Sequence, residues 1–163
     1  MMKKIFIFMA ACLETGFIAG ILWEHRRAKN KIMEKNRNID NLQRNQRFLL
    51  AWLKLHGRSD MFDAYFKWYG AGNIAVYGNG QIGKCFIREL ADTKVKVQYI
   101  IDRNAKYMDS EIPIYSLEED LPKVDAIVIA VMNQSDSIAE EIERKCGYSV
   151  ISIEDVIDGS SMY

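Results

Sequence analysis

A glycine motif at the end of a short apolar run restricts the fold of this chain more than any other feature. The run Ile74–Tyr77 is followed directly by a G-x-G-x-x-G motif and then by a helical pattern. A strand, this spacing and a helix are the order found where a βα turn binds a phosphate. Gly78 permits the tight turn, Gly80 lets the backbone approach a phosphate, and Gly83 lets the helix pack on the strand. The predicted phosphate-binding residues are Gly78, Asn79, Gly80, Gln81, Ile82 and Gly83.

A second predicted strand, Val95–Ile101, ends at an acidic residue that fits the same architecture. Asp102 comes 19 positions after Gly83, where a Rossmann unit places the carboxylate that binds a ribose hydroxyl pair. Arg103 follows, either to accommodate the 2′-phosphate of NADP or simply as a solvated side chain, so the choice between NAD and NADP stays open. The alternative is a Rossmann-like fold whose glycine turn is only structural.

Further apolar runs extend this unit into an α/β fold. Ile112–Tyr115 and Val124–Val131 are predicted strands, and the second is apolar enough for the middle of a parallel sheet. Residues 57–163 therefore predict a Rossmann-like parallel sheet of four or five strands with helices on both faces, preceded by a long N-terminal helix. The loop after the Val124–Val131 strand lies where such sheets bind ligands. The predicted substrate crevice comprises Asn133, Gln134 and Ser135.

Residues 73–131 resemble the N-terminal nucleotide-binding domain of capsule-type polysaccharide-biosynthesis sugar epimerases and dehydratases. The matching segments are Val76–Gly83, Ile100–Arg103, Ile112–Tyr115 and Ser116–Pro122. The stretch Trp52–Gly70 is also similar to the lead-in of small Rossmann modules attached to bacterial glycosyltransferases and methyltransferases. The resemblance implies a dinucleotide or nucleotide-sugar ligand and an accessory role in cell-surface polysaccharide biosynthesis. Asn79 departs from the usual alanine, and Arg103 departs from a common second acid.

No complete catalytic set accompanies this motif in the sequence. The Tyr-x-x-x-Lys pair with which short-chain epimerases and dehydratases move a proton does not occur. His25 and His56 lie far from any cysteine, and no C-x-x-C pair exists, so no metal site is predicted. Three hypotheses remain: a binding module, an oxidoreductase completed by a partner subunit or by oligomerisation, and a structural interaction domain. A nucleic-acid reader is not expected, because the upstream residues lack helix-turn-helix spacing.

The N-terminal segment predicts a transmembrane helix over residues 1–24. Ile5 to Trp23 is a run of 19 residues with one charge, Glu14, and as a helix it spans ~28 Å, close to the thickness of a bilayer. Glu14 opposes this interpretation, because a carboxylate at mid-membrane costs roughly 2.5–3.5 kcal/mol. Gly16 and Gly20 form a G-x-x-x-G pair that suits a homo-oligomer of such helices. The alternatives are a buried helix of a soluble protein and a secretory signal.

Charge is divided unevenly along the chain. Residues 1–72 carry 13 Lys and Arg against 6 Asp and Glu, whereas residues 73–163 carry 9 against 16. The basic excess follows the apolar segment directly, in residues 25–58, and therefore predicts that this side faces the cytoplasm. We expect a protein of the cell membrane with its Rossmann-like domain on the cytoplasmic side.

Residues 25–56 predict a basic connecting helix with a weak coiled-coil pattern. Apolar residues fall on heptad positions, with Lys35 and Gln46 interrupting them. These apolar residues are Ile32, Ile39, Leu42, Leu49 and Leu53. A solvated basic helix beside an anionic membrane is the alternative.

Overall fold

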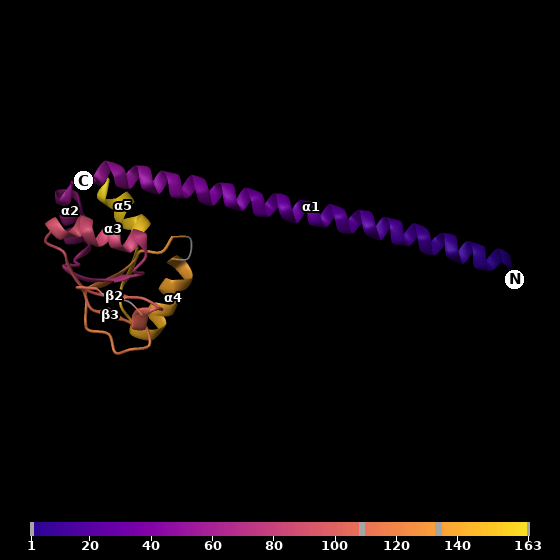
Figure 1. Cartoon of the computed structure of the whole chain (residues 1–163). Helices are drawn as coiled ribbons and strands as arrows, with labels where there is room; N and C mark the ends of the chain where they lie inside the picture. The colour runs from indigo at the N-terminus through magenta and orange to yellow at the C-terminus, as the bar shows by residue number, and fades with distance from the viewer. Residues whose placement is uncertain (1, 108–109, 133–134, 163) are drawn as a thin grey trace. The chain divides into compact units, whose positions relative to one another are not determined.

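The computed structural model describes residues 2–107, 110–132 and 135–162, and of residues 2–22 it describes the backbone alone. By their internal contacts the residues form two units, Met1–Arg44 and Asn45–Tyr163. The second unit is an α/β fold, and its elements can be followed in Figure 1. In chain order the elements are α1 (Met2–Leu55), α2 (Ser59–Tyr69), β1 (Asn73–Tyr77), α3 (Gln81–Glu89), η1 (Leu90–Asp92), β2 (Lys96–Ile101), η2 (Ala105–Tyr107), β3 (Ile114–Tyr115), β4 (Ala126–Ile129), α4 (Ser135–Cys146), β5 (Val150–Ser152) and α5 (Ile153–Ser160).

The five strands form one parallel sheet in the order β3-β2-β1-β4-β5. The central strand β1 pairs with β2 on one side and with β4 on the other. Each of the four residues of β4 is buried, which is the pattern of a strand covered on both faces. This confirms the predicted Rossmann-like parallel sheet, with five strands and a long helix before it.

Each face of the sheet has its own apolar core. The side chains of Ile74 and Val76 contribute to a core with α1, α2, α3 and α5, whereas those of Ala75 and Tyr77 contribute to a core with α4. Figure 1 shows α2, α3 and α5 on one side of the sheet and α4 on the other. The alternation follows from the period of two along a strand. Helices therefore cover both faces, as predicted.

The last turns of α1 belong to the first of these cores. Phe48, Trp52 and Leu55 are buried and recur at helical spacing, so they lie on one face of the helix. The ring of Trp52 lies edge-on to Phe48, at 5.4 Å between centroids, and to Phe86 of α3, at 6.5 Å. The unit Asn45–Tyr163, which we call the compact unit, thus includes residues upstream of Gly57.

The segment that begins at Ser116 forms a turn, although its sequence also favours the start of a helix. Ser116 and Glu119 have the S-x-x-E spacing of a capping box, which is typical of a helix start. The capping hydrogen bonds are present: the Ser116 N–H donates to Glu119 Oε1 at 3.1 Å, and the Glu118 N–H donates to Ser116 Oγ at 3.2 Å. They close only a turn, because Pro122 follows within the next turn and disfavours a helical conformation just before it.

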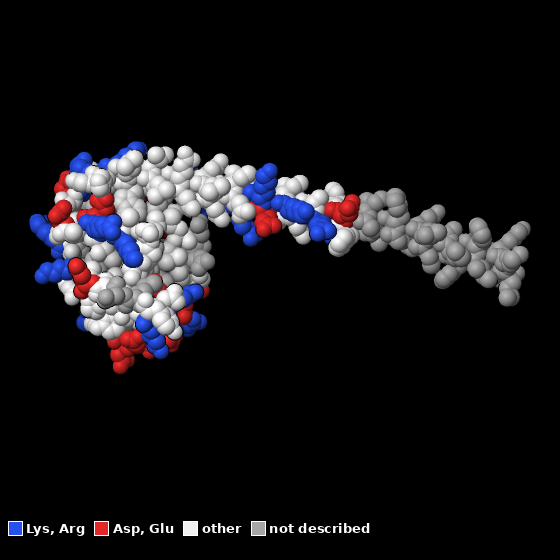
Figure 2. Space-filling model, in the orientation of Figure 1, with Lys and Arg blue, Asp and Glu red and all other residues white. Residues whose placement is uncertain are grey.

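Residues Met1–Arg44 form the other unit, whose side chains are described from Trp23 onward. Apart from Trp23 and Glu24, the predicted membrane segment lies outside the residues described in full. Within those residues, no helix combines the length and the apolar character needed to cross a bilayer. The Arg27 guanidinium lies 5.4 Å from the centre of the Trp23 ring. Figure 2 shows both basic and acidic side chains among uncharged ones on the described part of this helix.

Candidate functional site

The predicted glycine turn joins β1 to α3, and two of its glycines are required by close backbone contacts. Gly78 has a φ of +104°, and a Cβ added there would lie 2.8 Å from Cγ2 of Val131. A Cβ added at Gly83 would lie 2.0 Å from the carbonyl oxygen of Gly78. The turn is therefore closed against β4 on one side and against its own helix on the other.

Gly80, in contrast, borders open space. It precedes the first residue of α3, is exposed, and has no atom within 4 Å of the place where a Cβ would be. No side chain caps this helix start. The first amides of a helix have no partner within the helix, so they offer an anion a place to bind. The open side of Gly80 gives a phosphate direct access to the backbone there.

Asp102 lies beside this turn and is held in place by backbone hydrogen bonds. Its Oδ2 accepts the N–H of Asn79 at 2.8 Å, and its Oδ1 accepts the N–H of Asn104 at 2.8 Å. The carboxylate thus joins the glycine turn to the loop after β2. Each carboxylate oxygen can accept a second hydrogen bond, so the group can still bind a pair of ribose hydroxyls.

The side chain of Arg103 interacts with that of Tyr77, and this interaction raises the pKa of Arg103 above its usual value. Tyr77 belongs to the core on the α4 face. Arg103 therefore interacts with the protein itself in this structure.

The carboxyl ends of β1 and β4 mark the switch point of this sheet. The chain leaves β1 for α3 on one face and leaves β4 for α4 on the other, and such a switch point is where α/β sheets bind ligands. Ser135 begins α4 beside this point. Asn133 and Gln134, also predicted to line the crevice, lie outside the described residues.

No known protein family, curated protein or solved structure matched this chain. The geometry of the glycine turn, of Asp102 and of the switch point is therefore the basis for the functional conclusion.

A cavity of about 380 Å³ beside Asn79 is lined by residues of α3, of β2 and of the segment before β3. Two of its lining residues, Lys84 and Arg88, lie one helical turn apart on α3 and were not predicted as site residues. Their i, i+4 spacing directly after the glycine motif could have indicated that both side chains lie on one face of α3 near the turn. The remaining lining residues are Ile87, Ile100, Ser110, Glu111 and Ile112. The basic pair and the single carboxylate of Glu111 leave this cavity with a net positive lining.

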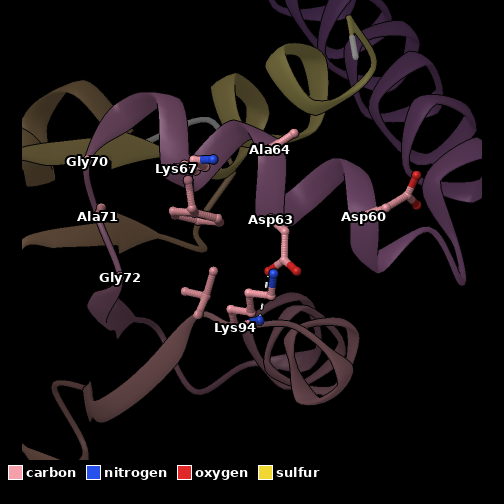
Figure 3. Close-up of a pocket in the computed structure, with 10 residues that line it drawn as sticks. Asp60, Asp63, Ala64, Lys67, Gly70, Ala71, Gly72 and Lys94 are labelled. Atoms are coloured by element: carbon pink, nitrogen blue, oxygen red, sulfur yellow. Dashed lines mark hydrogen bonds between the residues drawn. The ribbon is translucent and has the colours of Figure 1, made fainter.

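A second hollow, of about 520 Å³, lies at the other end of the strands, away from the glycine turn. Gly72 and Val95, which line it, directly precede β1 and β2, so it borders the amino-terminal ends of the strands. Figure 3 shows Asp63 directed at Lys94, whose N–H it accepts at 2.7 Å. Open α/β sheets bind ligands at the carboxyl ends of their strands, so we assign this hollow a packing role.

The described residues include no group of three or more His, Cys, Asp or Glu that could hold a metal ion. His56 is instead hydrogen-bonded to Glu89, with 2.5 Å between Nδ1 and Oε1. Cys85 is exposed, and partial burial raises the pKa of the Cys146 thiol.

Proposed function

We propose that the unit Asn45–Tyr163 binds a dinucleotide or a nucleotide-sugar at its glycine turn. The observation that carries this proposal is the open backbone at Gly80 beside the fixed carboxylate of Asp102. The diphosphate would lie at the start of α3, where the backbone amides and the helix dipole favour an anion. A ribose of the ligand would donate its hydroxyls to Asp102. NAD and UDP-sugars combine a diphosphate with such a ribose, whereas the adenosine ribose of NADP carries a phosphate in place of its 2′-hydroxyl.

The proposed role of the whole chain is that of a membrane-tethered accessory protein in bacterial cell-surface polysaccharide biosynthesis. It is supported by the apolar segment Ile5–Trp23, the basic residues that follow it, and the resemblance of residues 73–131 to the capsule-type enzymes. In this arrangement the tether holds a bound nucleotide at the cytoplasmic surface. The chemistry would then be completed by the enzymes that use this nucleotide.

Gly80→Val is expected to weaken ligand binding by about tenfold or more, because its side chain would occupy the space that a phosphate needs. Calorimetric titration of the full chain with NAD, NADP and UDP-glucose measures this effect. Gly72→Val is the matched control. Gly72 lies at the other end of β1 from the glycine turn, and a Cβ there meets nothing closer than 4.0 Å. This variant should leave the Kd unchanged. Absence of heat with all three compounds, or equal weakening by both variants, would contradict the proposal.

The full chain is expected to sediment with membranes and to resist extraction by high salt. A variant without residues 1–24 should remain in the soluble fraction, because the apolar run contributes most of the hydrophobic free energy of insertion. Fractionation of cells that express each form measures the difference. Salt extraction of the full chain would instead mean that only the basic residues 25–58 hold it at the membrane.

A further inference from the structure

Helix α1 carries a second apolar face that the described core does not use. We call it the seam: Ile32, Ile39, Leu42, Leu49 and Leu53. Their exposed fractions are 60%, 43%, 67%, 53% and 69%. Single exposed apolar residues are common on protein surfaces, but five at heptad positions of one helix indicate a contact surface.

The order of residue types in the seam indicates how it pairs. In one heptad register, Ile32 and Ile39 occupy a positions, whereas Leu42 and Leu49 occupy d positions. Isoleucine at a with leucine at d favours two parallel strands. Gln46, at an a position, is a polar residue of the kind that fixes the register of a pair at some cost in stability.

The charges of this segment fit a second copy of the same chain. Residues 32–53 contain six charged side chains, and five of them fall on the outer b, c and f positions. The e and g positions, which face each other across a parallel pair, carry no charge between residues 32 and 53. Lys35 is the exception, at a d position, and its long stem allows the ammonium group to reach solvent. Two copies can therefore meet with little repulsion between like charges.

Two residues of the seam, Leu49 and Leu53, also border an apolar recess in the unit Asn45–Tyr163. There Leu49 and Leu53 of α1 meet Ile82 and Cys85 of α3 around a cavity of about 270 Å³. Gln81, which follows Gly80, lies at the rim of this recess. A second helix that contacts Leu49 and Leu53 would cover this recess, and this would add apolar area to the contact.

We propose that two copies of this chain associate in parallel and in register through the seam, with the recess as part of the interface. This association is independent of whether a nucleotide binds. It would bring the glycine turns of both copies close to one shared interface.

Disulfide crosslinking of the full chain in detergent tests this arrangement. In a background where Cys12, Cys85 and Cys146 are replaced by serine, Lys35→Cys and Gln46→Cys should each give a disulfide-linked dimer on mild oxidation. A disulfide requires Cα atoms within about 7 Å, and only a parallel, in-register pair brings both positions next to their own copies. Arg37→Cys and Arg44→Cys, at outer f positions, are the controls, and at least tenfold less dimer is expected from them. Equal yields from seam and control positions, or dimer from only one seam position, would overturn the proposal.

A second pair of variants tests the apolar contact itself. Leu42→Asp combined with Leu49→Asp should reduce the Gln46→Cys dimer at least tenfold, because it places like charges at two d positions. Met33→Asp is the control: Met33 is similarly exposed, at 54%, but occupies an outer b position. Circular dichroism checks that each variant retains its helix content. Survival of the dimer in the double variant, or its loss in Met33→Asp, would overturn the proposal.

Discussion

Gly83→Ala is expected to destabilise the compact unit by about 3 kcal/mol and to lower its thermal midpoint by roughly 10 °C. The added Cβ would lie 2.0 Å from the carbonyl oxygen of Gly78, far inside van der Waals contact. That carbonyl belongs to a turn which cannot move freely, because the Gly78 N–H donates to Ile101 O at 2.8 Å. Either α3 moves away from β1 or the first turn opens.

Gly80→Ala provides the comparison within the same motif. Its Cβ would meet no atom within 4 Å, and its φ of −75° suits any residue, so a change of no more than about 0.5 kcal/mol is expected. Thermal denaturation followed by circular dichroism measures both variants under the same conditions. If the two variants have the same thermal midpoint, α3 does not pack closely on the glycine turn.

Trp52→Ala is expected to lower the free energy of unfolding by about 3–5 kcal/mol. Trp52 is only 7% exposed, and its indole lies between Phe48 of its own helix and Phe86 of α3. Removal of the ring leaves a cavity in the core that joins α1 to the sheet. The effect should therefore appear in the unfolding of the whole compact unit, although Trp52 precedes the first strand by some twenty residues.

Leu50→Ala is the matched control for this prediction, since Leu50 lies two residues away on the same helix and is about half exposed. It should change the free energy of unfolding by less than about 1 kcal/mol. Urea denaturation of the full chain, followed by the fluorescence of the remaining tryptophans, compares the two variants. Similar losses would show that the end of α1 contributes little to the core. A fragment that begins at residue 57 should be unstable for the same reason that Trp52→Ala is, because it lacks this aromatic contact.

Local sequence patterns were sufficient for the fold and for the glycine turn at which we propose the site. The glycine spacing specifies a turn that only glycine can form at Gly78 and Gly83, and the next predicted strand ends at an acid. Their meeting follows from parallel pairing: β1 and β2 are adjacent, so the residues at their carboxyl ends lie side by side, and the Asn79 N–H reaches Asp102. The contact between Asn79 and Asp102 could be predicted from the sequence, because few strand orders are compatible with this succession of strands and helices.

Contacts between side chains distant in sequence were decided by the tertiary structure. The run from Phe48 to Leu55 is apolar on both helical faces, so its periodicity could not indicate which face is buried. Packing against Phe86 selected the face with Trp52 and left Leu53 exposed. In the same way, Arg103 follows Asp102 in sequence but interacts with Tyr77, a residue of the core on the α4 face. The sequence by itself determined the backbone turn and its acid, since these depend on spacing and backbone conformation. Which side chains remain available for a ligand or a partner depended on the atoms that distant segments bring against them.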